Sequence, residues 1–194
     1  MIKINSECLS LLTILILFYN CSGDGYKRMS IEDPKTLLSI QDSLLIIKGN
    51  NQSIVDALVN AHNNVAEKYI NEGDNVLAVR HYKKARELNS SDKVSKYGLL
   101  ITEGRLLISK GNKNGIWDAI EKFSKASTLY PKNGEPFYWM AISYTKLGDT
   151  DFDLILESYE KALSLELDVK QRSKAEEKYE KEKERKKKLD SFWK

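Results

Sequence analysis

Three segments of this 194-residue chain repeat one pattern, and the repetition limits the possible folds more than any other feature. Each segment has a helical stretch, a glycine and an apolar residue, then an aromatic residue four positions later and an alanine three after that. The segments span residues 66–89, 104–131 and 141–166. Because one helix pair cannot bury its own apolar face, repeated pairs must stack. The pattern therefore predicts an all-α fold of stacked helix pairs.

Each repeated position has a physical role in such a pair. The glycine permits a tight reversal of the chain between two helices. The small residue lets the two helices approach closely, and the aromatic ring fills the space between them. The glycines, aromatic residues and alanines are, in that order, Gly73, Gly111, Gly148, Tyr82, Phe123, Tyr159, Ala85, Ala126 and Ala162.

These residues resemble the consensus of the tetratricopeptide repeat (TPR), a helix–turn–helix unit of about 34 residues. The resemblance covers roughly residues 59–167. The alanine-to-alanine spacing is longer than the family's, at 41 and then 36 residues, and Ile155 replaces the first small residue of the third unit. The resemblance implies a short right-handed helical-repeat solenoid of about three helix pairs. We expect an N-terminal helix before it and a long charged C-terminal helix after it.

An uncharged apolar run extends from Cys8 to Tyr19. It is shorter than the ~20 residues that a membrane-spanning helix needs, and it is typical of the centre of a secretory signal. The sequence Cys21-Ser22-Gly23 after it resembles the lipobox of bacterial lipoproteins, whose cysteine carries a diacylglycerol and becomes the first residue. The resemblance implies a covalent lipid on Cys21 and no other cofactor. An uncleaved membrane anchor and an ordinary signal peptide are the alternatives.

The sequence predicts four regions along the chain. They are a signal peptide (1–20), a lipidated tether (21–32), a TPR-like helical domain (33–167) and a charged capping helix or tail (168–194). Gly23-Asp24-Gly25 is expected to be flexible. Asp33-Pro34 suits the start of a helix that ends near Gly49. Ser53 is expected to cap the next helix, which runs to about Asn71.

The positive charge of the chain is concentrated at its C-terminal end. Asp168 to Lys194 holds 11 Lys/Arg and 7 Asp/Glu, a balance of +4, whereas the whole chain carries +3. So small a net charge predicts no nucleic-acid partner. The apolar residues Leu189, Phe192 and Trp193 either fold back on the solenoid or are exposed for a partner.

The sequence contains no arrangement that indicates catalysis. His62 and His81 are expected at the surface or rim, and no Cys/His set has metal-ligand spacing. The stretch 111–115 lacks the phosphate-loop pattern and is interpreted as a repeat turn. Trp117 and Trp139 are expected in the core. We therefore expect neither an enzyme nor a metal or small-molecule ligand.

In the TPR family the first helix of each pair lines a concave groove that takes a peptide or helix of another protein. The resemblance implies partner-binding roles for Asn63, Glu67, Ile70, Asn71, Ile101, Arg105, Ile108, Tyr138, Ile142, Thr145 and Lys146. Some family members hold a C-terminal carboxylate with a Lys-and-Asn set. Here those positions hold Asn63, Glu67 and Ile101, which does not favour that ligand.

Together the two resemblances imply a lipid-anchored, non-catalytic adaptor on the periplasmic face of a bacterial envelope. Its partner would be another envelope protein, for example one of an assembly or secretion machine. Ser22 is not the Asp that retains some lipoproteins at the inner membrane, which favours the outer membrane. An RNA-binding helical repeat that uses the basic tail and a self-associating structural protein are the alternatives.

Overall fold

The computed structural model describes residues 23–49, 51–148 and 152–192. These residues form ten helices and no strand, so the predicted all-α repeat solenoid is confirmed. The helices are α2 (Gly23–Glu32), α3 (Pro34–Ser39), α4 (Gln41–Lys48), α5 (Gln52–Glu72), α6 (Asn75–Leu88), α7 (Lys93–Lys110), α8 (Lys113–Leu129), α9 (Glu135–Leu147), α10 (Phe152–Leu163) and α11 (Val169–Phe192).

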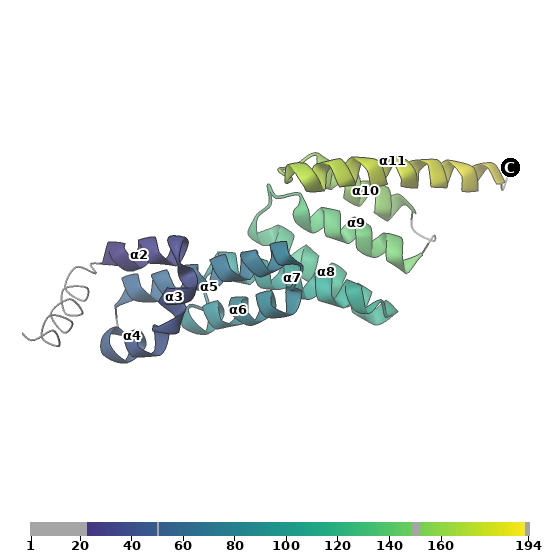
Figure 1. Ribbon diagram of the computed structural model, residues 1–194. Coiled ribbons are helices and arrows are strands. Elements are labelled where there is room, and N and C mark those ends of the chain that lie inside the picture. Colours follow the sequence, from purple (N-terminus) through teal and green to yellow (C-terminus); the bar gives the residue numbers. More distant parts are fainter. Residues whose placement is uncertain (1–22, 50, 149–151, 193–194) are drawn as a thin grey trace, which may run out of the picture.

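Consecutive helices pack in pairs along the solenoid (Figure 1). The pairs are α5 with α6, α7 with α8, and α9 with α10, and each pair contacts the next. Helices α2 and α3 pack on α5 at one end, and α11 packs on α10 at the other. The two ends of the stack are thus covered by helices outside the three repeats, as stacked repeats require.

The repeated positions occupy the interior of the pairs, as predicted. The three alanines and Phe123 are fully buried, and Tyr82 and Tyr159 are nearly so. Gly73 and Gly111 have left-handed backbone angles and end α5 and α7. Ile155, which replaces the first small residue of the third unit, is also fully buried. The repeat pattern in the sequence therefore corresponds to the helix-pair interfaces of the fold.

The second repeat accommodates its extra residues in longer helices. Helix α7 has 18 residues and α8 has 17. Asn112 caps α8, because its side-chain Oδ1 accepts a hydrogen bond of 2.6 Å from the backbone N–H of Gly115. The stretch 111–115 is thus a repeat turn followed by the first turn of α8, in agreement with the prediction.

Residues 23–32 differ from the predicted tether, because they form helix α2. Tyr26 and Ser30 of α2 are buried, and two amides of α5 hold Ser30. Asn60 Nδ2 donates to Ser30 Oγ, and Asn64 Nδ2 donates to the Ser30 carbonyl, both at 2.8 Å. The flexible linker expected at Gly23-Asp24-Gly25 is instead the first turn of a helix, which its packing against α5 stabilises.

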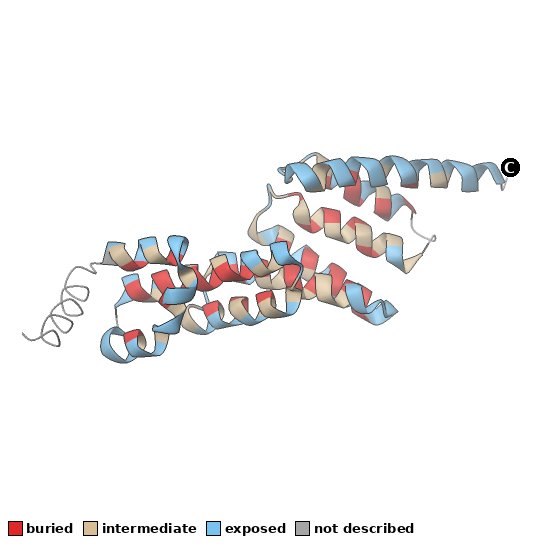
Figure 2. Cartoon of the chain, in the orientation of Figure 1, coloured by how far each residue is buried: buried red, intermediate tan, exposed pale blue. Residues whose placement is uncertain are grey.

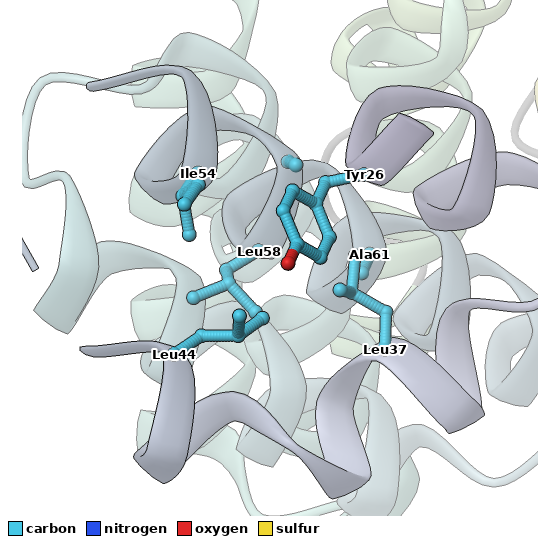
Figure 3. Close-up of a cluster of buried hydrophobic side chains, with 7 residues drawn as sticks. Tyr26, Leu37, Leu44, Ile54, Leu58 and Ala61 are labelled. Carbon is cyan, nitrogen blue, oxygen red and sulfur yellow. The ribbon is translucent and has the colours of Figure 1, made fainter. Parts of the chain in front are cut away.

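The helix predicted from Asp33 to Gly49 is broken at Ile40, where φ is −105° and ψ is 8°. Leu37 before the break and Leu44 after it both pack into one apolar cluster against α5 (Figure 3). The next helix is capped by Asn51, whose Oδ1 accepts from the Ser53 N–H at 3.0 Å, and not by Ser53 itself. Packing against α5 thus accompanies the division into α3 and α4 of a segment for which local patterns had predicted a single helix.

The predicted long charged C-terminal helix is confirmed as α11. It is exposed along most of its length (Figure 2), and its buried residues are Ala175 and Glu182. Arg185 Nη1 lies 2.8 Å from Glu182 Oε2. Leu189 and Phe192 are exposed, the latter at 80%, and Trp193 lies outside the described residues. Leu189 and Phe192 are thus exposed at the end of α11 and do not fold back into the solenoid.

Arg172 of α11 binds the C-terminal end of α10. Its Nη1 donates to the Leu163 carbonyl at 2.9 Å, and its Nη2 donates to the Leu165 carbonyl at 2.8 Å. Helix ends leave such carbonyls without intrahelical partners. We expect Arg172→Ala to lower the free energy of unfolding by roughly 1–3 kcal/mol, since charged hydrogen bonds to these oxygens are lost. Urea denaturation checks this, with Lys170→Ala on the exposed first turn of α11 as control; equal midpoints for the two variants would contradict it.

Candidate functional site: a pocket on the first helices of the pairs

A concave pocket of about 200 Å³ lies where the first helices of the three pairs come together. Residues of four helices line it: Glu67, Ile70 and Asn71 of α5, Tyr82 of α6, Val94, Tyr97, Gly98 and Ile101 of α7, and Glu135 of α9. The residues of α5 are spaced i, i+3, i+4, and those of α7 are spaced i, i+3, i+4, i+7. Each set therefore forms one stripe on its helix, and the two stripes face the same space.

Glu135 begins α9 and joins three helices through its carboxylate. Tyr97 of α7 donates its hydroxyl to Oε2 at 2.9 Å. Trp139 Nε1 and Gln171 Nε2, the latter from α11, donate to Oε1 at 3.2 Å each. Asn133 Nδ2 in turn donates to the Tyr97 hydroxyl at 2.9 Å. These bonds hold both the carboxylate and the Tyr97 ring in one orientation at the pocket.

The pocket is negatively charged on one side. Burial raises the pKa of Tyr82, and the nearby carboxylates of Glu67 and Glu135 raise it further. Burial and Glu135 likewise raise the pKa of Tyr97, so both phenols stay neutral. Arg105 is a cation that interacts electrostatically with Glu135, and its Cζ lies 4.9 Å from the centroid of the Trp139 ring. Burial lowers the pKa of Arg105, and Glu135 opposes this effect.

Four of the predicted partner-binding residues line the pocket together: Glu67, Ile70, Asn71 and Ile101. Arg105 lies close enough to act on Glu135 electrostatically. The others lie outside this lining. Asn63 is buried and donates to Asp92 Oδ2 at 3.1 Å, Ile108 and Tyr138 are in the core, Ile142 and Thr145 are half-buried, and Lys146 is exposed. A role of these residues in binding a partner stays a prediction.

Sequence reasoning missed Val94, Tyr97, Gly98, Tyr82 and Glu135 as pocket residues. The spacing of Val94, Tyr97 and Ile101 on one helical stripe was a usable signal. Glu135 had none, because its place in the pocket depends on hydrogen bonds from residues 36 to 38 positions away in the sequence. Tyr82 is predicted to pack between the helices of its pair. Its ring does so and also lines the pocket.

Three larger hollows are surface features. One, of about 530 Å³, lies on α11 alone, and the other two lie at turns. The larger of these two, of about 720 Å³, is lined by residues 129–133 and 166–168. The other, of about 700 Å³, is lined by residues 45–49, 51 and 52. Each is formed by one or two short stretches of chain. The smaller pocket differs because side chains from four helices converge on it, which is typical of binding sites.

Two expectations about polar and aromatic side chains are wrong. His62 is buried rather than at the rim, between His81 and Gln41. Trp117 is 46% exposed and not in the core, although its ring contacts Tyr144 edge-on with 6.3 Å between centroids. Within the part of the chain that the structure describes, no group of three His, Cys, Asp or Glu residues is placed to hold a metal ion.

The two histidines form a chain of hydrogen bonds that depends on protonation. His62 Nε2 lies 2.8 Å from Gln41 Oε1, and His62 Nδ1 lies 3.0 Å from His81 Nδ1. Since Gln41 Oε1 only accepts, neutral His62 accepts from His81 at Nδ1. Burial lowers the pKa of His62 to about 4, and His81 and Lys84 add to this. Burial, Lys84, Arg80 and Lys35 lower the pKa of His81.

We therefore expect the protein to lose stability as the pH falls from 6.5 towards 4. Between pH 6.5 and 4 His62 is protonated in the unfolded chain but stays neutral in the folded protein. The free energy of unfolding is therefore at its full value above pH 6.5 and declines below it. The loss should be on the order of 2 kcal/mol. Urea denaturation at pH 7 and pH 5 measures it. The double variant His62→Gln/His81→Gln should lose less over that range, and an equal loss would contradict the assignment.

Comparison with known proteins identifies the fold of this chain but not its activity. No protein-family model matches the sequence, and no curated protein matches it. The crystal structure of yeast Tom70, a TPR protein, superposes with a TM-score of 0.53 at 18% identity. The match covers 91% of this chain and 39% of the Tom70 chain, so this chain spans less than half of that protein. The chain is thus a helical-repeat solenoid with a TPR-like fold.

Proposed function

We propose that this chain is a non-catalytic adaptor that binds a peptide or helix of another protein in the pocket between α5, α7 and α9. The observation that carries the proposal is the convergence of side chains from four helices on one concave site. At about 200 Å³ the site is smaller than the ~300–1,000 Å³ typical of small-molecule pockets. It is of a size to take one or two side chains of a partner segment.

A photo-crosslinking amino acid placed at single positions tests this site in cells. At Asn71, which is exposed and lines the pocket, we expect a crosslink to one protein. At Glu121, which is exposed on α8 and lines no part of the pocket, we expect none. The Asn71 crosslink should be lost when Tyr97→Ala removes one wall. Equal crosslinks from both positions would show that the pocket is not the binding site.

We further propose that Cys21 carries a lipid that holds the solenoid at the periplasmic face of a bacterial outer membrane. The sequence around Cys21 supports this, as does the position of α2. Because α2 begins at Gly23 and its residues Tyr26 and Ser30 already pack on α5, only a short link would separate the lipid from the folded domain. None of the described helices combines the length and apolar character needed to cross a bilayer.

Metabolic labelling with a radioactive fatty acid tests the anchor. We expect label on the unmodified chain and on Cys8→Ala, whose cysteine lies in the predicted signal, and none on Cys21→Ala. Fractionation on a sucrose gradient then distinguishes the outer from the inner membrane. Equal label on Cys21→Ala and the unmodified chain would refute the lipid anchor without touching the proposed pocket.

A further inference from the structure

We infer that the pocket recognises a positively charged side chain, an arginine or a lysine, that is flanked by apolar residues in the partner segment. This inference rests on the proposed peptide-binding function and names the chemistry of its ligand. It follows from three features of the pocket: two carboxylates without a paired cation, apolar and aromatic walls, and a fixed orientation of one carboxylate.

The first feature is the absence of charge pairing. Glu67 is exposed and has no ion pair among the described residues, and the hydrogen-bond donors on Glu135 are the neutral groups of Tyr97, Trp139 and Gln171. Neutral donors orient a carboxylate but leave its charge in place. Arg105 offsets part of this charge, yet it lies over the Trp139 ring and makes no ion pair within the described chain.

Two other carboxylates on these helices, by contrast, are paired with lysines. Glu72, one turn beyond Glu67 on α5, lies 4.0 Å from Lys68. Glu103 on α7 lies 3.5 Å from Lys83 and 2.8 Å from Lys122. The two carboxylates at the pocket are therefore available to a cation from outside the chain.

The second feature is the composition of the walls. Ile70, Val94 and Ile101 provide apolar contact, and the rings of Tyr82 and Tyr97 border the same space. A long basic side chain buries its aliphatic stem along such surfaces while its charged head reaches a carboxylate. Aromatic faces also attract the cation itself. An acidic side chain or a C-terminal carboxylate would instead face two like charges.

The third feature is the remaining capacity of Glu135. Its two oxygens offer about four acceptor positions, and the hydrogen bonds from Tyr97, Trp139 and Gln171 use three of them. One position, on Oε2, stays available to an N–H donor of a ligand. Because the Glu135 carboxylate is already held in place, it need not reorient when a guanidinium or ammonium group binds. Little binding free energy is therefore lost.

Three peptides that differ at one position test the inference on the full chain in detergent micelles. They are acetyl-Ala-Leu-X-Leu-Ala-amide with X as arginine, citrulline or glutamate; citrulline has the shape of arginine without its charge. The side-chain methyl signals of Ile70 and Ile101 report binding in the pocket, and those of Ile46 and Ile47 on α4 serve as distant controls. We expect the arginine peptide to shift the pocket signals and to bind about tenfold more tightly than the citrulline peptide.

Two variants locate the charge that is recognised. Glu67→Gln should weaken the arginine peptide roughly three- to tenfold and leave the citrulline peptide unchanged. Glu72→Gln, an exposed change on the same helix outside the pocket, should alter neither. Loss of arginine binding in both variants would assign the effect to general surface charge and overturn the inference.

The outcomes separate this inference from the proposed function. Equal shifts by the arginine and citrulline peptides, or tighter binding of the glutamate peptide, would overturn the basic-side-chain specificity and leave peptide binding in the pocket intact. No shift at Ile70 or Ile101 with any peptide at millimolar concentration would overturn both. A shift confined to Ile46 and Ile47 would place the binding surface on α4 and would also overturn both.

Discussion

Replacement of Phe123 by alanine is expected to destabilise the protein by roughly 3–5 kcal/mol. The ring is fully buried between α7 and α8, and it stacks near Trp139 of the next pair, with 6.4 Å between ring centroids. Its loss leaves a cavity at the centre of the stack, where each pair depends on its neighbours. A native domain is stable by only about 5–15 kcal/mol, so this one change should remove a large part of the total.

Urea denaturation followed by circular dichroism measures the effect. The matched control is Phe192→Ala, which truncates the same side chain at a position that is 80% exposed. We expect that control to change the free energy of unfolding by about 0.5 kcal/mol or less. If the two variants unfolded at the same urea concentration, the buried ring would not be the centre of the stack that the structure indicates.

The second large effect is expected from Gly98→Ala in α7. A Cβ atom at this position would lie 2.2 Å from Cζ of Tyr82, which is closer than real contacts allow. Alanine normally stabilises a helix by about 0.5–1 kcal/mol relative to glycine. Here we expect a loss of roughly 1–3 kcal/mol, because the ring must shift against a packed neighbour. Gly104 has the same relation to Phe123, whose Cε1 would lie 2.4 Å from the new Cβ.

A double-mutant cycle identifies the cause of this loss. Tyr82→Leu removes the ring atoms that the new methyl group would meet, so Gly98→Ala should cost much less in that background. We expect a coupling free energy of about 1 kcal/mol or more, the size seen for residues in direct contact. If the effects of the two substitutions simply added, the close approach of Tyr82 to Gly98 would not be the source of the destabilisation.

The repeat interfaces were readable in the sequence because their requirements are local. A turn glycine, and an aromatic ring followed three residues later by an alanine, satisfy one helix pair, and the same three needs recur in each pair. The structure places Gly73, Tyr82 and Ala85 in these roles. The longer spacing of the second unit was also accommodated locally, within α7 and α8.

The packing glycines and the N-terminal helices were harder to predict, because their roles depend on neighbours distant in sequence. Gly98 looks like a weak point in a helix until Tyr82 of the preceding pair is placed against it. The sequence of α2 begins with Gly23-Asp24-Gly25 and looks like a linker. It becomes a helix because Ser30 meets Asn60 and Asn64, which follow 30 and 34 residues later.

The sequence by itself determined the all-α class, the three helix pairs, their turns and the charged last helix, since periodicity and side-chain size act within one pair. Only the tertiary structure decided which side chains share the pocket. Glu67, Tyr97 and Glu135 come from three helices, and stacking of the pairs brings them together. Packing of α4, α5 and α6 made a neutral hydrogen-bonded pair of His62 and His81. Both outcomes depend on contacts between residues that are far apart in the sequence, which no local pattern specifies.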